Sequence, residues 1–314
     1  MRHNPGCATK KRACSSKLLE TLKSELAMTS NKGAILLAGL LLAGLAFAGQ
    51  PAKPELPSNP ADLVRKAIDN EMRPAGNNTH YRFRLTKKMP ERTETKEMIG
   101  TSSGVIGRLV ALNGRALTPE QRQKEDKRLE RLVKDPSAMA AKQKEQKDDD
   151  ARTRKMVKAL PEAFVYRYAG TEQRAPWGEL VMLTFRPNPN FSPPSRELMV
   201  YKGMQGSMWI AVPEYRLAKI EANLFRDVSF GWGILGHLDS GGQFAVEQRP
   251  VANGDWAPTH MVLNFTGKVL LFKTIKIRQD ETTSDYRQVP DMSAAQAVEL
   301  LKKCDQAMAE KKAN

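Results

Sequence analysis

Cysteine is almost absent from this chain of 314 residues, which contains only three. Two of them, Cys7 and Cys14, lie in an N-terminal stretch that we expect to be removed on export. Cys304 would then remain alone, so no internal disulfide could form in the mature protein. A free cysteine usually packs as a small hydrophobic residue, and we expect this of Cys304. The mature fold must therefore be held together by burial alone, which one domain of this length can achieve.

Histidine is also scarce, and the patterns that bind zinc are missing. The mature chain keeps His80, His237 and His260, and no two of them have the spacing of a metal motif. Neither His-Glu-x-x-His nor Cys-x-x-Cys occurs in the sequence. The sequence therefore excludes zinc catalysis, and we expect no metal, no cofactor and no enzymatic activity.

Two short patterns resemble catalytic motifs but lack their context. Residues 231–236 match Gly-x-Gly-x-x-Gly, yet a strand-like segment follows where dinucleotide binding requires a helix. Residues 100–104 match Gly-x-Ser-x-Gly, yet charged residues precede them and a strand-like run follows, so we predict a β-turn. His237, Asp239 and Ser240 are close in sequence, but such neighbours seldom have triad geometry. We therefore assign no catalytic residue.

One long uncharged run is present near the N-terminus. Residues 34–48 follow Lys32 and end in Ala46-Phe47-Ala48, the small-x-small pattern that a signal peptidase cuts. A membrane-spanning helix needs ~20 apolar residues, so a retained anchor is disfavoured. We expect cleavage after Ala48 and a periplasmic or secreted protein. Residues 1–27 are polar and unlike a signal peptide, so we expect Met28 to be the true start codon.

The mature chain is basic. Removal of residues 1–48 leaves 43 Lys and Arg residues and 33 Asp and Glu residues, a net charge of +10. Such a balance favours acidic partners, for example anionic lipid headgroups or peptidoglycan. Nucleic acid is not expected as a partner, because the protein would work outside the cytoplasm.

Local patterns predict one domain over residues 59–290, after a flexible leader at 49–58 that is rich in Pro and Lys. Asn59 and Pro60 are typical of a helix start, and apolar residues at helical spacing follow as far as Met72. Tyr81, Phe83 and Leu85 alternate with arginine, which predicts a strand with one buried face. Further strands are expected over residues 93–99 and 104–112.

Residues 117–160 are highly charged and interrupt this pattern. Residues 118–121 form a capping box, and Asp135-Pro136 divides the segment into two predicted helices. Apolar residues are sparse there, so we expect a solvated helical insertion, dispensable for folding, rather than an arm that binds a partner.

Strand patterns fill residues 163–287. Their connections are too short for parallel crossovers, so the strands should form an antiparallel meander, with one turn at Thr266-Gly267. Residues 291–314 should form a C-terminal helix that starts at a capping pair, Ser293 and Gln296. The predicted fold class is α+β, with a curved antiparallel sheet, an open half-barrel, packed on a few helices.

Aromatic and apolar side chains of this sheet are the candidate binding residues. Each of them could simply fill a core between sheet and helices. A curved sheet that faces few helices nevertheless tends to leave a cavity, and ligand sites are concave and mostly apolar. The residues assigned to a concave, ligand-binding face are Tyr81, Phe83, Tyr166, Trp209, Ile220, Phe244, Leu263 and Phe265.

The layout of residues 60–290 resembles the LolA-like periplasmic lipoprotein-carrier fold, shared with the lipoprotein receptor LolB and the sigma-factor regulator MucB. The stretch from residues 188–194 to residues 272–273 is similar to uncharacterised secreted proteins described as relatives in lipoprotein sorting. A predicted hairpin is similar to one of that superfamily: Gly203-Met204-Gln205-Gly206-Ser207-Met208-Trp209-Ile210, leading to Tyr215-Arg216-Leu217. The resemblance implies an open barrel whose concave face holds acyl chains.

Two functions follow as expectations. The first is a periplasmic carrier or scaffold for the acyl chain of a lipid or lipoprotein, with Lys and Arg at the rim for acidic headgroups. The second is a non-enzymatic envelope module with a filled core, whose surface recognises another envelope protein. An extracytoplasmic hydrolase is a third and weaker interpretation.

Overall fold

A computed structural model describes residues 55–73, 79–212, 214–230, 236–252, 254–269 and 273–313. The predicted signal peptide and its cleavage site lie outside these residues, as do most of the leader and of the 231–236 run. Lys53–Asn314 form one unit by their internal contacts. No helix in the described ranges combines the length and apolarity needed to cross a membrane.

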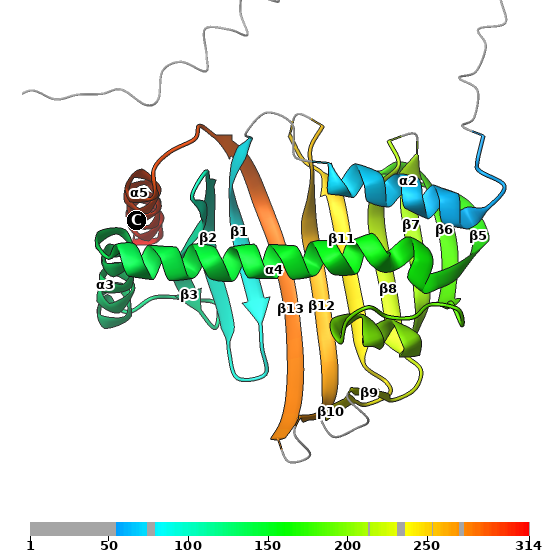
Figure 1. The fold of residues 1–314 in the computed structure, drawn as a ribbon. Helices are drawn as coiled ribbons and strands as arrows, with labels where there is room; N and C mark the ends of the chain where they lie inside the picture. Colours follow the sequence, from blue (N-terminus) through cyan, green and yellow to red (C-terminus); the bar gives the residue numbers. More distant parts are fainter. Residues whose placement is uncertain are drawn as a thin grey trace, which may run out of the picture. The chain divides into compact units, whose positions relative to one another are not determined.

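A single antiparallel sheet organises this unit and confirms the predicted α+β class (Figure 1). Its strands are β1 (His80–Lys88), β2 (Thr93–Thr101), β3 (Gly104–Leu112), β4 (Arg115–Ala116), β5 (Phe164–Arg174), β6 (Gly178–Pro187), β7 (Met204–Val212), β8 (Arg216–Leu224), β9 (Val228–Phe230), β10 (Gly236–Leu238), β11 (Gln243–Pro250), β12 (Trp256–Val269) and β13 (Lys273–Val289).

The order across the sheet is β4-β3-β2-β1-β13-β12-β11-β8-β7-β6-β5, with β9 and β10 beside β12. Because β4 and β5 end this path without meeting, the sheet is open and not a closed barrel. Many strands adjacent in sequence pair as predicted for a meander, but β8 pairs with β11 rather than with β9, and β10 pairs with β12 rather than with β11. The central pairing of β1 with β13 instead joins residues about 200 positions apart, such as Tyr81 and Gln288.

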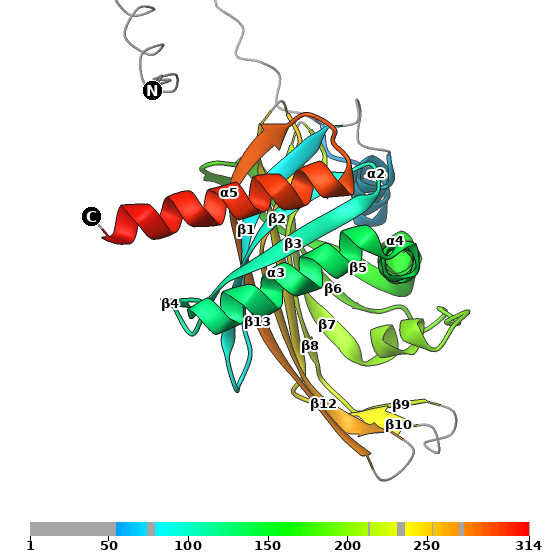
Figure 2. The ribbon, with the colours of Figure 1, turned by 90° about the vertical axis from the view of Figure 1, so that its left-hand side faces the viewer.

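Within the described ranges, four α-helices and one 3-10 helix accompany the sheet: α2 (Pro60–Met72), α3 (Pro119–Lys134), α4 (Pro136–Ala163), η1 (Glu197–Gly203) and α5 (Ala294–Ala313). The predicted caps are confirmed. The Asn59 side chain accepts from the Ala61 N–H, Thr118 and Gln121 form a capping box, and Ser293 and Gln296 bond reciprocally. Figures 1 and 2 show α2 and α4 over one face of the sheet and α3 and α5 at its β3 end.

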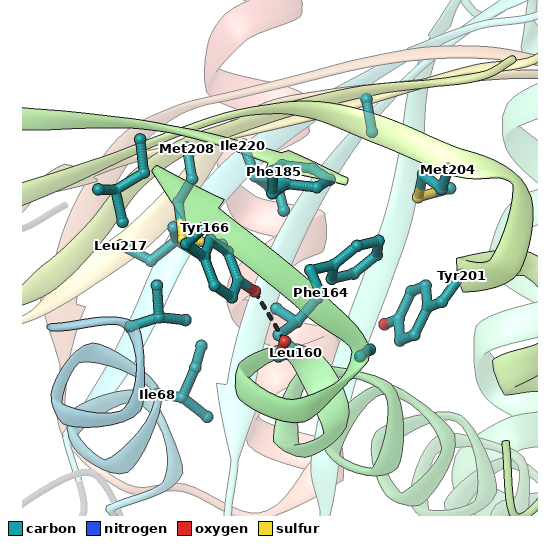
Figure 3. Close-up of a cluster of buried hydrophobic side chains, with 14 of the residues drawn as sticks. Ile68, Leu160, Phe164, Tyr166, Phe185, Tyr201, Met204, Met208, Leu217 and Ile220 are labelled. Atoms are coloured by element: carbon teal, nitrogen blue, oxygen red, sulfur yellow. Dashed lines mark hydrogen bonds between the residues drawn. The ribbon is translucent and has the colours of Figure 1, made fainter. Parts of the chain in front are cut away.

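The main core lies between α2, the C-terminal end of α4 and strands β5 to β8 (Figure 3). Leu63, Val64 and Ala67 of α2 are completely buried in it. The Tyr166 hydroxyl donates to the Leu160 carbonyl oxygen over 2.7 Å, which satisfies a buried polar group and ties β5 to the end of α4.

A second core shows that the charged insertion is part of the fold. Leu129 of α3 is completely buried against Ile99, Ile106 and Leu301. Met156 and Leu160 of α4 pack into the main core. The two predicted helices and their break at Asp135-Pro136 are confirmed. The expectation that the insertion buries little is wrong, because its few apolar residues all fall where the helices meet the sheet.

The same insertion covers the edge of β3. The Gln146 side chain accepts from the Val105 N–H and donates to the Val105 carbonyl, over 3.1 and 2.7 Å. Glu125 accepts from the Leu109 N–H over 2.8 Å, and Arg128 donates to the Gly107 carbonyl over 2.6 Å. These side chains satisfy backbone groups that would otherwise offer a template for another strand.

Buried charges attach α5 to the outer side of β1–β3. Arg108 is 2% exposed and pairs with Asp305 of α5 and Asp126 of α3. Burial alone would lower the pKa of Arg108, but hydrogen bonds to both carboxylates raise the pKa above its ordinary value. Cys304 is half-buried and accepts a hydrogen bond from Arg82 over 2.8 Å, so it packs at this junction.

Two turn predictions have opposite outcomes. Residues 100–104 do turn between β2 and β3, where the Thr101 hydroxyl donates to the Gly104 carbonyl over 2.8 Å. The turn at Thr266-Gly267 is wrong, because β12 continues through it. A Cβ atom on Gly267 would lie 2.2 Å from the His237 carbonyl oxygen. This glycine therefore permits close approach of β10 rather than a turn.

Candidate ligand-binding site

The face of the sheet that α2 and α4 cover, called the inner face below, is defined by cross-strand pairing. Residues directly opposite each other in an antiparallel pair share a face. Ile220 belongs to the main core, and its partner Val246 in turn pairs with Met261 of β12. The next row joins Ala222, Phe244 and Leu263 in the same way. Both rows therefore continue the core face from β8 across β11 to β12.

The inner face is filled at its β5–β8 end. Of the residues assigned to a ligand, Tyr166 and Ile220 are 6% exposed and Phe265 is 9% exposed. All three belong to the main core, to which α2, the end of α4 and strands β5 to β8 also contribute. These side chains are already covered by the protein itself, so they can form only the floor or end wall of a site.

The inner face is different where α4 crosses β1, β13 and β12 (Figure 1). Every residue of α4 from position 147 to position 155 is exposed. Over this stretch the helix therefore buries none of its side chains against the strands. Its two ends are held, by Gln146 at the β3 edge and by Met156 in the main core. The middle of α4 thus crosses the sheet with its side chains exposed, while both of its ends are packed.

Apolar side chains of the strands remain incompletely buried on the part of the inner face away from the main core. Ile277 of β13, which pairs with Phe265, is 37% exposed and is one of the few exposed large hydrophobic residues. Other inner-face residues have intermediate burial: Phe244, Val246, Met261, Leu263 and Ile275 on β11 to β13, and Phe83, Leu85 and Met98 on β1 and β2. We call Ile277 and these eight residues the apolar strip. Unlike the filled end, the strip retains apolar area that a ligand could remove from water.

The structure brings two of the predicted site residues together, namely Phe244 and Leu263, which are directly paired. Phe83 lies on the same face but on β1, beyond the row that contains Lys87 and Glu281. Tyr81 lies beyond the apolar strip at one end of β1, where its hydroxyl donates to Asp255 over 2.7 Å. Burial, reinforced by this hydrogen bond, raises the pKa of Tyr81 to about 12. Tyr286 stacks on Phe83 and meets Tyr81 edge to face, with ring centroids 5.2 and 6.1 Å apart.

Trp209 is on the opposite face and must be removed from the predicted site. It packs in a separate cluster with Trp177, Leu180, Ala211 and Ala218. Its neighbour Met208, which is completely buried in the main core, occupies the inner face instead. Its aromatic character suggested a ligand contact, but strand alternation decides the face.

Sequence reasoning missed most of the apolar strip. Met261 and Leu263 lie two residues apart on β12, and Ile275 and Ile277 lie two residues apart on β13. The period of two within each strand therefore already indicated that the members of each pair share a face. The incomplete burial of these residues was not indicated, since it depends on how the helices cross the sheet.

Ion pairs interrupt the apolar strip between β1 and β12, because Glu281 of β13 lies directly opposite Met261 on one side and Lys87 on the other. Lys87 pairs with Glu281 over 2.9 Å, and Lys96 pairs with Glu94 over 2.8 Å. Burial would raise the pKa of Glu94, but hydrogen bonds from Lys96 and Arg92 hold it below its ordinary value. The inner face is therefore amphipathic, with an apolar strip beside charged groups.

The three neighbours His237, Asp239 and Ser240 each make a polar contact. The His237 Nε2 atom lies 3.1 Å from Asp239 Oδ1, while the Ser240 N–H donates to Asp227. No group of three or more His, Cys, Asp or Glu side chains in the described ranges is placed to hold a metal ion.

Comparisons with known proteins assign no family. No known family matches the sequence, and no curated protein was found as a relative. One solved structure with some similarity is the crystal structure of a DUF1329 family protein from Desulfovibrio piger. It has 9% sequence identity and a TM-score of 0.25, over 75% of this chain and 94% of that chain. A likeness of this size supports no argument about fold or function.

Proposed function

We propose that this protein is a periplasmic carrier or scaffold that binds the acyl chain of a lipid or lipoprotein along the apolar strip. One observation carries the proposal: apolar side chains of the inner face, Ile277 the most exposed among them, remain incompletely buried, and the middle of α4, which crosses this face, is exposed. The predicted signal peptide and the resemblance to LolA-like carriers agree with this proposal. The uncovered side chains are apolar, so an extended hydrocarbon fits their chemistry.

The expected affinity is modest. Burying each methylene group contributes ~0.8 kcal/mol, so a chain of ~14 carbons contributes on the order of 10 kcal/mol. Association and ordering cost ~4–15 kcal/mol, which leaves an affinity in the micromolar range. A carrier must also release its ligand, and such an affinity is compatible with transfer.

Displacement of a fluorescent fatty acid tests the proposal. We expect saturable binding to the wild-type protein and at least tenfold weaker binding to Ile277→Asp, because the carboxylate would face the hydrocarbon. Val165→Asp is the matched control, since Val165 is 49% exposed and lies on β5, outside the apolar strip. Both variants should remain folded, as shown by circular dichroism.

Absence of saturable binding to the wild-type protein would refute the proposal. Equal loss of binding in the two variants would show that the fatty acid does not use the apolar strip.

A second candidate function is a non-enzymatic envelope module that recognises another protein. The filled end of the inner face favours this alternative, because Tyr166, Ile220 and Phe265 leave no room for a ligand there. A native mass spectrum of the purified protein separates the two candidates. Co-purified lipid supports the carrier, and a bare protein mass in repeated preparations supports the module.

A further inference from the structure

Three cationic side chains from different elements gather at the β3 end of the inner face. Lys96 lies on β2 and shares the inner face with Leu85, its partner on β1. Arg128 of α3 reaches the Gly107 carbonyl of β3 over 2.6 Å. Lys142 of α4 lies one turn before Gln146, on the helix face that turns toward β3. We call these three residues the cationic cluster.

Two members of the cationic cluster have carboxylate partners and the third does not. Lys96 pairs with Glu94 over 2.8 Å, and Arg128 pairs with Glu125 over 2.7 Å. Lys142 is half-buried, and among the described residues no carboxylate lies within ion-pair distance of it. Burial, together with the charges of Arg128 and Lys96, lowers the pKa of Lys142, although Glu145 partly opposes this. A half-buried ammonium beside two other cations is costly without an anion.

The apolar strip begins next to this cluster. Leu85 lies directly across from Lys96, and Met98 follows two residues later on the same face of β2. A hydrocarbon chain that covers Leu85 and Met98 would therefore bring its charged end to the cationic cluster. The chemistry that suits both regions is a hydrocarbon with a negatively charged end.

We propose that the cationic cluster binds the anionic group of an amphiphile whose acyl chain lies on the apolar strip. This inference rests on the proposed function and narrows its ligand to an anionic lipid or fatty acid. Lys142 supplies the free ammonium, and Lys96 and Arg128 add positive potential from β2 and α3. A neutral lipid with the same chain would leave Lys142 without a partner.

The test compares palmitate that carries a fluorophore on its chain with the methyl ester of the same molecule. We expect the wild-type protein to bind the acid about tenfold more tightly than the ester, the loss that corresponds to one charge-assisted interaction. Lys142→Met should remove this preference by weakening acid binding alone. Lys142→Arg should keep most of it, because the positive charge is retained.

Lys147→Met is the matched control, since Lys147 is exposed on the same helix and its removal changes the net charge equally. It should leave the affinities for both probes unchanged. Equal binding of acid and ester by the wild-type protein would overturn the anionic site and leave the acyl-chain proposal intact. Equal effects of Lys142→Met and Lys147→Met would also overturn it. Failure of both probes to bind would instead refute the proposed function. If Lys142→Met does not fold, the preference of the wild-type protein for the acid over the ester decides whether the anionic site exists.

Discussion

Truncation of Leu129 tests whether the charged helical insertion is part of the folding unit. Leu129 belongs to α3, within a segment where charged residues dominate the sequence. Its side chain is nonetheless completely buried, in a cluster with Ile99, Ile106 and Leu301. The variant Leu129→Ala removes the contact between α3 and this cluster without changing any charge.

The expected cost follows from burial. Replacing a buried leucine by alanine destabilises a protein by roughly 2–5 kcal/mol, through lost transfer free energy and the cavity that remains. Leu129 is completely buried, so the cavity left by the substitution would be closed to solvent. We therefore expect a loss of stability within this range. Domains are stable by only about 5–15 kcal/mol, so the loss would be a large fraction of the total.

Urea unfolding monitored by circular dichroism measures the change, with the free energy of unfolding extrapolated to water. Lys147→Ala is the control within the same insertion, and its exposed position predicts a change within about 0.5 kcal/mol. Replacing residues 118–159 by a short Gly/Ser loop should have a larger effect than Leu129→Ala, because it also uncovers Leu132, Met156 and the β3 edge. A Leu129→Ala protein as stable as the control would refute this account of the insertion.

Two further predictions concern the filled end of the inner face and alkaline pH. Ile220→Asp should abolish cooperative thermal melting near neutral pH, because an unpaired buried carboxylate costs several kcal/mol. The control Ile277→Asp should melt within a few degrees of the wild type. If both variants are equally tolerated, the core around β8 is open. The second concerns Tyr81, whose pKa is raised to about 12 in the folded protein, while an unfolded tyrosine ionises near pH ~10. Between these values the unfolded state releases a proton that the folded state keeps, so the free energy of unfolding should fall as pH rises, and Tyr81→Phe should reduce this fall in urea titrations at pH 9 and 11.

Part of the candidate site was accessible from sequence. Alternation placed Phe83, Phe244 and Leu263 on apolar faces of strands, and all three lie on the apolar strip. Trp209 shows the limit of choosing residues by type, because its strand turns it to the opposite face. The division into a filled end and an exposed strip was inaccessible, since both contain the same kinds of side chain. Only the path of α4 and the position of α2 determine which of them are covered.

The sequence by itself determined the local elements of this protein. Helix starts at Asn59 and Thr118, the break at Asp135-Pro136 and the alternation along β1 depend on hydrogen bonds and side-chain periods within a few residues. Only the tertiary structure decided that β1 pairs with β13, that the insertion covers the β3 edge and that Lys142 lies within reach of the charges of Lys96 and Arg128. These arrangements join segments far apart in the chain, and a period-2 pattern specifies which face of a strand is buried without specifying its neighbour.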